Sequence, residues 1–209
     1  LYRQPEPRGL PAVFEALLVN GDFWPQVLQA RRLGLSDLAL GAVMAVRLPA
    51  LDAAGGLAAL GEFLADDHEL GRRVARAGWR IRLSAAVADC LEAPAGAVKT
   101  WRHQLRWART ARACRPAAYF FSVLGNPLLG PLLWLAATGF APAAAAAVAA
   151  WTALRVALAA DHWRRITGRR PGWRALLVPA ADLLRAALWA AALAGRRVGW
   201  GGGEYEVRS

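Results

Sequence analysis

The sequence predicts two joined parts: a mixed α/β region up to residue 115, followed by apolar helices that cross a membrane. Hydrophobic residues make up 56% of the 209 residues and the mean hydropathy is +0.25, whereas soluble domains are about 45–50% apolar. Residues 116–154 carry no formal charge. Before this run, segments with a helical period are interleaved with segments that favour strands, which predicts a layered α/β fold.

The charge balance excludes several classes of protein. The chain has 26 basic and 15 acidic residues, a net charge of +11, and Lys99 is its one lysine. The high apolar content excludes a disordered tail. Two cysteines, Cys90 and Cys114, are too few to staple a chain of this length, which excludes a disulfide scaffold. Charge alone would allow a nucleic-acid-binding protein, but arginines that flank apolar stretches are typical of membrane proteins. We therefore expect no nucleic-acid partner.

The first 115 residues alternate between the two kinds of periodicity. Three segments favour helices and two favour strands, one buried and one half-exposed. The helices are expected at residues 11–19, 48–54 and 66–77, and the strands at residues 40–46 and 79–83.

Two adjacent carboxylates begin the helix predicted at residues 66–77. The dipole and the free N–H groups of a helix N-terminus stabilise ionised Asp66 and Asp67. An ionised carboxylate at the rim of a sheet can act as a general base. The alternative is a purely structural helix start, in which Asp66 and Glu69 form a capping box. We expect His68 to be an ordinary exposed helix residue.

A basic amphipathic helix is predicted around residues 100–110. At 100° per residue, Arg102, Arg106 and Arg109 form one stripe, and an apolar stripe that contains Trp101 and Leu105 lies beside it. Such a helix suits the lipid headgroup layer. An arginine of the stripe could also grip a diphosphate while a tryptophan stacks on a sugar or base. The two interpretations are compatible.

The apolar run at residues 116–154 is long enough for two spans of about 20 residues each, with a turn at residues 139–142. A third apolar stretch, residues 175–195, follows a basic loop. The alternative is a buried alanine-rich hairpin of a soluble protein, but arginines at the span ends and an excess of tryptophan favour a bilayer. We expect Asp182 and Arg185, three residues apart, to neutralise each other along one helix.

The charge rule places residues 1–115 and the basic loop together in the cytoplasm. Three complete spans would put the basic start of the tail outside, so we expect residues 175–195 to be partly re-entrant or the first apolar stretch to be divided differently. The tail, residues 196–209, is rich in glycine, which indicates a loop.

Taken together, these pieces resemble the membrane-bound family 2 glycosyltransferases. The resemblance is closest to the ceramide glucosyltransferase-like branch, which includes the hopanoid-biosynthesis-associated bacterial enzymes. The matching pieces are GAVMAVR at residues 41–47, ADD at 65–67, GWR at 78–80, HQLRW at 103–107 and WGGGEY at 200–205.

The resemblance implies roles for individual residues. Asp67, the second acid of the pair, would be the catalytic base of an inverting reaction, with Asp66 beside it in the substrate site. Arg106 and Trp107 fall on the RW of a (Q/R)xxRW motif that binds donor diphosphate and acceptor. His103 occupies the first position of that motif, where the family has Gln or Arg, so this contact departs from the pattern.

The resemblance also implies the fold and the partners. Residues 1–96 would be the C-terminal part of a GT-A-type domain, 97–115 an interfacial helix, 116–195 about three transmembrane helices and 196–209 a polar tail. The donor would be a nucleotide sugar and the acceptor a ceramide-, hopanoid- or glycerolipid-like hydroxyl. A divalent metal, Mg or Mn, would be bound by residues upstream, because no DxD motif occurs here, so the chain would lack the donor-binding half.

Three alternatives remain at this level. A processive polysaccharide synthase usually needs more spans than the sequence predicts. A non-enzymatic protein could use the basic helix only as a lipid anchor, which would leave Asp67 replaceable. A transport component would use intramembrane charges such as Asp182 as its site. The expected location is a bacterial inner membrane, with the catalytic part in the cytoplasm.

Overall fold

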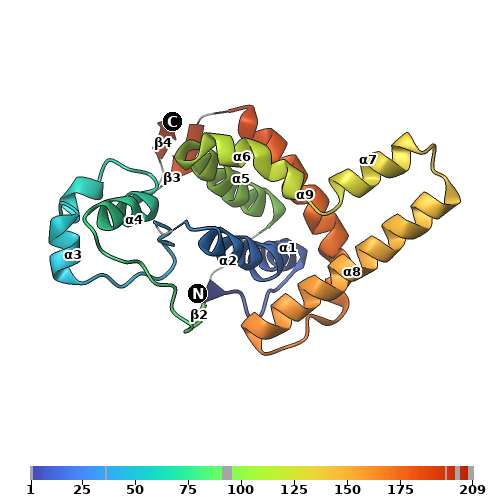
Figure 1. The fold of residues 1–209 in the computed structure, drawn as a ribbon, viewed down its shortest axis with the longest axis horizontal. Coiled ribbons are helices and arrows are strands. Elements are labelled where there is room, and N and C mark those ends of the chain that lie inside the picture. Colours follow the sequence, from blue (N-terminus) through green and yellow to red (C-terminus); the bar gives the residue numbers. More distant parts are fainter. Residues whose placement is uncertain (1, 36, 91–95, 196, 201–202, 207–209) are drawn as a thin grey trace.

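The computed structural model describes residues 2–35, 37–90, 96–195, 197–200 and 203–206, and within them the chain is mostly helical (Figure 1). Its elements in order are β1 (Tyr2–Arg3), α1 (Leu10–Leu18), the π-helix η1 (Val19–Phe23), α2 (Trp24–Arg32), α3 (Leu48–Ala53), the 3₁₀ helix η2 (Ala58–Leu60), α4 (Asp66–Arg76), β2 (Ala88–Asp89), α5 (Ala97–Cys114), α6 (Pro116–Phe121), η3 (Ser122–Gly125), α7 (Leu129–Ala137), α8 (Pro142–Thr167), η4 (Gly172–Leu177), α9 (Val178–Leu193), β3 (Arg197–Trp200) and β4 (Gly203–Glu206).

The three predicted helices of the first region are confirmed as α1, α3 and α4. Proline stands in the first turn of α1 and α3, where its missing N–H leaves no hydrogen bond unmade. Gly78 follows α4 with a φ of 84°, a left-handed conformation that favours glycine. These local signals explain why the helix positions could be predicted.

The two predicted strands are wrong. Neither residues 40–46 nor residues 79–83 form strands, and the described sheets are only a parallel pair, β1 with β2, and an antiparallel pair, β3 with β4. A strand needs a partner for its N–H and C=O groups, and in the described residues these two segments pair with no other strand. Instead residues of both segments line a cavity of about 1060 Å³. The α/β class is therefore corrected to a mostly helical fold with little sheet.

The main core joins the first region to the apolar helices. Its buried members come from α1, α8 and α9, and Trp101 and Leu105 of α5 pack against them. They are Val13, Ala16, Leu17, Leu18, Ala159, Trp163, Val178, Ala181 and Leu188. Because α1 shares a core with α8 and α9, the N-terminal region and the apolar helices pack against each other.

Two segments are long and apolar enough to cross a membrane, α8 and residues 172–193. A third candidate is a bent pair, Pro116–Gly125 with Leu129–Ala137, whose halves meet at 56°. The predicted turn before α8 is confirmed, and Phe140 occupies it with a φ of 59°. Helices α7 and α8 form a hairpin that projects away from α3 and α4 (Figure 1). The first apolar stretch is thus divided differently from two plain spans.

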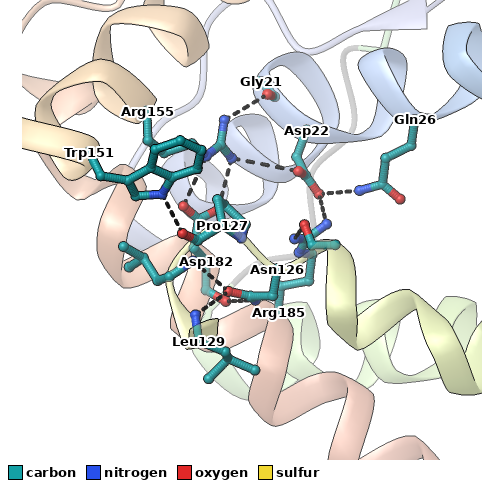
Figure 2. A network of polar contacts seen from close by, with 12 residues as sticks. Gly21, Asp22, Gln26, Asn126, Pro127, Leu129, Trp151, Arg155, Asp182 and Arg185 are labelled. Atoms are coloured by element: carbon teal, nitrogen blue, oxygen red, sulfur yellow. Dashed lines mark hydrogen bonds and ion pairs between the residues drawn. The ribbon is translucent and has the colours of Figure 1, made fainter. Parts of the chain in front are cut away.

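The predicted pairing of Asp182 with Arg185 is wrong. Arg155 of α8 donates to both oxygens of Asp182, at 3.0 and 2.8 Å, and Arg185 donates to Asp22 of η1 at 2.7 Å (Figure 2). The two acids and two arginines therefore connect three elements instead of neutralising each other along α9. Partners from distant segments satisfy these buried charges better than a neighbour one turn away.

The tail is also more ordered than a glycine-rich loop. Strands β3 and β4 pair in an antiparallel hairpin, while residues 196, 201–202 and 207–209 lie outside the described part. Arg109 of α5 donates to the carbonyl of Arg197. Arg112 donates to the carbonyls of Leu193 and Gly195 and so caps the end of α9. Arg109, expected to face lipid phosphates, thus contacts the tail instead.

Candidate functional site

The proposed base, Asp67, lies in the first turn of α4 and is half-buried. Its Oδ2 accepts a hydrogen bond from the backbone N–H of Gly41 at 2.8 Å, and its Oδ1 accepts one from the N–H of His68 at 2.7 Å. A Cβ at position 41 would lie only 3.0 Å from Oδ2. Glycine therefore allows the loop to approach the carboxylate closely.

The loop that carries Gly41 is fixed against α4 at two further points. Arg115, just after α5, donates to both oxygens of Asp37 at 2.7 Å. A Cβ on Gly71 would lie 2.4 Å from the carbonyl oxygen of Asp37, so α4 and the loop pack with no room for a side chain. The position of Asp67 thus depends on contacts between α4, this loop and the end of α5.

The structure corrects the capping box at this helix start. Asp66 is exposed and its Oδ1 accepts from the N–H of Asp67 at 2.8 Å, while Ala65 is the N-cap residue and makes no side-chain cap. Glu69 points to Arg72 and Arg73 instead, at 2.5 and 2.6 Å. Hydrogen bonds from Arg72 and Arg73 lower the pKa of Glu69 to about 2. The acids at this end thus have separate partners.

One face of α5 carries aromatic and thiol side chains in a single stripe. His103, Trp107 and Cys114 follow at intervals of four and seven residues, which puts them on one stripe. The ring centroids of His103 and Trp107 are 4.5 Å apart, and Trp107 packs on a core cluster that contains Tyr2 and Trp24.

Electrostatics link this stripe to Asp67. Burial raises the pKa of the Cys114 thiol and of the Tyr2 hydroxyl, and the negative charge of Asp67 adds to both shifts. Asp67 therefore lies within electrostatic reach of Tyr2 and of Cys114 at the end of α5. The roles that the resemblance implies for Asp67, Arg106 and Trp107 stay predictions.

His103 has a partner that the sequence reasoning missed. Glu15 of α1 is fully buried; its Oε1 lies 2.8 Å from Nδ1 of His103 and accepts from Nε2 of Gln104 at 3.1 Å. A buried carboxylate is destabilising unless it is paired. The signal was present in the sequence, because Glu15 is the one charged residue in the apolar stretch of residues 10–19.

Arg106 and Arg102 differ although they share the basic stripe. Arg106 is half-buried, and burial lowers the pKa of its guanidinium. Arg102 is exposed. The two arginines of one stripe therefore differ in burial, which gives a matched pair for testing the role that the resemblance implies for Arg106.

The cavity of about 1060 Å³ lies next to the loop that contacts Asp67. Its wall includes Tyr2, Trp24, Leu40 and Gly71, and Leu40 immediately precedes the glycine that contacts Asp67. Most of its other lining residues are apolar. Among the residues that the structure describes, no group of three His, Cys, Asp or Glu side chains could hold a metal ion. The expected divalent metal thus finds no ligand set in these residues.

Comparison with protein-family models gave one match, to glycosyl transferase family 21, and it covers residues 1–209. The chain belongs to this family. Comparisons with curated proteins and with solved structures gave no match. Membership of family 21 and the apolar helices support a glycosyltransferase associated with a membrane, and they confirm the resemblance at that level.

Proposed function

We propose that this family 21 protein is an inverting glycosyltransferase that moves a sugar from a nucleotide sugar to the hydroxyl of a membrane lipid. The observation that carries the proposal is the position of Asp67. It is an acid held by the backbone N–H of Gly41, which directly follows Leu40 in the wall of an apolar cavity. Family membership and the candidate spans support the lipid acceptor.

In the proposed reaction, Asp67 accepts the proton of the lipid hydroxyl as the hydroxyl oxygen attacks the anomeric carbon. A new C–O bond forms while the bond to the nucleoside diphosphate breaks on the opposite face, which inverts the configuration. The guanidinium of Arg106 would stabilise the leaving diphosphate, and Trp107 and His103 would contact the substrates, with Asp66 next to the base. No step is assigned to a metal, because the described residues supply no ligand set.

The proposed substrates follow the family resemblance. The sugar would be of the glucose or N-acetylglucosamine type, and the acceptor a ceramide-, hopanoid- or glycerolipid-like lipid. The apolar wall of the cavity, which includes Val43, Met44 and Leu83, supports an acceptor with a large apolar part.

The test is replacement of Asp67 by Asn in the full-length protein. The amide retains size and much of the hydrogen bonding but cannot take a proton, so transfer of labelled sugar to lipid should fall at least about a hundredfold. Donor binding, measured separately, should be unchanged. Asp66→Asn is the comparison variant and should cost some stability and a smaller fraction of the activity, because Asp66 is exposed and its Oδ1 accepts from the N–H of Asp67. Near-normal turnover of Asp67→Asn would show that this carboxylate only begins a helix.

We also propose that the catalytic region lies in the cytoplasm and that the α7–α8 hairpin enters the membrane. Arg3 donates to the carbonyl of Ile166 at 2.9 Å, and Arg169 pairs with Glu6, so the basic loop after α8 packs on the N-terminal region. Helix α9 packs on α1 at its start and is capped from α5 at its end. Both ends of α9 thus contact the catalytic region, which supports the partly re-entrant course.

Cysteine labelling tests this topology. Thr138 and Arg170 are both exposed, one at the tip of the hairpin and one in the basic loop. With an impermeant reagent applied to intact cells, Thr138→Cys should react and Arg170→Cys should react only after lysis. Equal labelling at Arg170→Cys from outside would overturn the topology.

A further inference from the structure

The Arg155 network lies where α8 leaves the catalytic region. The half of α8 that follows Arg155 packs on η1, since a Cβ on Gly21 would lie 3.6 Å from Cβ of Ala159. The half that precedes it packs on α7 and carries exposed apolar residues such as Leu154. The network therefore lies at the boundary between the catalytic region and the apolar hairpin.

The four charges of the network balance. Arg155 and Asp182 are 13% and 2% exposed at their side chains, and Asp22, which pairs with both Arg155 and Arg185, is 15% exposed. Gln26 of α2 also donates to Asp22 at 2.7 Å (Figure 2). Two carboxylates and two guanidiniums give a net charge of zero in a largely dry place.

The bend between η3 and α7 places backbone carbonyl groups beside the Arg155 network. Between η3 and α7 the chain bends, and Asn126 holds the bend by donating to the carbonyl of Asp182 at 2.8 Å. Trp151 donates to the carbonyl of Pro127 at 2.6 Å, and Arg185 to that of Gly125 at 3.3 Å (Figure 2). Irregular backbone at membrane depth is tolerated where it is buried in protein or lines a polar cavity.

A cavity of about 260 Å³ opens beside this network. We call it the boundary pocket. Its polar lining includes Asp22, Gln29 and His162, and its apolar lining includes Trp151 and Leu158, which are about half exposed on α8. Nδ1 of His162 is buried and has no hydrogen-bond partner among the residues that the structure describes. The pocket is smaller than the sites of about 300–1,000 Å³ that hold drug-sized molecules, so it suits a headgroup and not a nucleotide sugar.

We propose that the boundary pocket binds the headgroup of an uncharged, hydroxyl-bearing membrane lipid, whose chains lie along Trp151, Leu154 and Leu158. A hydroxyl headgroup both donates and accepts hydrogen bonds, which matches His162 and Gln29. The ion pairs already neutralise the guanidinium of Arg155, so a phosphate would bring an uncompensated negative charge into a largely dry site. The pocket is a second lipid site, lined by other residues than the large cavity.

Photolabelling of the full-length protein in phosphatidylcholine nanodiscs tests the proposal. The probe is a diacylglycerol with a photoreactive diazirine near its headgroup, and the comparison probe is the matching phosphatidic acid. The diacylglycerol should label peptides from residues 25–29 and 151–162 in excess of those from α7, and unlabelled diacylglycerol should compete. The phosphatidic acid should show no such excess. The assay involves no sugar transfer, so it succeeds or fails independently of the proposed reaction.

Two variants sharpen the test. Leu158→Trp fills the pocket and should reduce the labelling excess to the level seen on α7, whereas Leu133→Trp, on an exposed leucine of α7 outside the pocket, should leave it unchanged. If Leu158→Trp fails to fold, Gln29→Ala on the exposed face of α2 replaces it. This variant should raise the diacylglycerol concentration needed for half-maximal labelling about fivefold. Equal labelling in all variants, or an equal excess with phosphatidic acid, would overturn the proposal.

Discussion

The Asp67 site and the Arg155 network both bring acids and arginines from distant segments together, but their surroundings differ. Asp67 is half-buried and accepts hydrogen bonds from N–H groups of a loop and of its own helix, and within the described part of the chain no guanidinium bonds to it. Asp182 is 1% exposed and both of its oxygens are bonded to Arg155. A carboxylate that must take up a proton needs the first environment, whereas a carboxylate that fixes helices needs the second.

This contrast predicts which substitutions should reduce activity and which should reduce stability. Changes at Asp67 should reduce turnover far more than stability, because an amide oxygen can keep one of the two bonds from the N–H groups of Gly41 and His68. Changes in the network should unfold the junction between the catalytic region and the hairpin, because a buried charge loses its counter-ion.

The largest expected effect on stability is that of Arg155→Met. The substitution leaves Asp182 buried without its cation, which should destabilise the protein by about 3–5 kcal/mol. Thermal unfolding of the purified protein in detergent measures this. Adding Asp182→Leu to Arg155→Met should restore most of the loss, because the pair is then replaced by apolar groups.

The matched control for that prediction is Arg164→Met, also on α8. Arg164 pairs with Asp161 at 2.9 Å, but its side chain is 55% exposed, so the change should be within about 1 kcal/mol. Equal losses for the two variants would remove the distinction between a buried network and surface pairs.

The same distinction explains what the sequence could predict. The roles of Asp67, Arg106 and Trp107 rest on short motifs and stay predictions, whereas the helices α1, α3 and α4 are confirmed where proline and glycine mark their ends. The partners of Asp182 and Arg185 could not be predicted, because Arg155 lies 27 residues from Asp182 and Asp22 lies 163 residues from Arg185. Spacing along one helix cannot indicate pairs between elements.

The predicted strands failed for a related reason. The alternation of apolar and polar residues at 79–83 indicates one buried and one exposed face. A strand also needs a neighbouring strand, which only the tertiary structure supplies. Arg31 donates to the carbonyl of Ile81 at 2.8 Å in place of a strand partner. The pairing of Glu15 with His103 could not be predicted either, because α1 and α5 are far apart in the sequence and meet only in the folded chain.

A smaller effect, on activity alone, is expected for Arg106→Lys. Lysine retains the charge but cannot form the bidentate fork, so sugar transfer should fall about tenfold while the protein stays membrane-bound and folded. Arg102→Lys is the control, because Arg102 is on the same stripe and exposed. If both variants keep full activity, the basic stripe serves only as an anchor.

The smallest expected effect concerns Glu69, which lies between the two environments: its side chain is 7% exposed, but its partners Arg72 and Arg73 are on the helix surface. Hydrogen bonds from these arginines lower its pKa from 4.5 to about 2. A lowered pKa stabilises the fold at pH values above the pKa of the unfolded state, and this contribution is lost as the pH falls through the pKa of the folded state.

Glu69→Gln should therefore lower the unfolding free energy by about 1 kcal/mol at pH 7. The difference from the wild type should remain constant down to about pH 5 and shrink between pH 4.5 and 2. Thermal unfolding across this range measures it, with exposed Glu62→Gln as the control. A difference that persists unchanged at pH 2.5 would mean that Glu69 acts through packing and not through its charge.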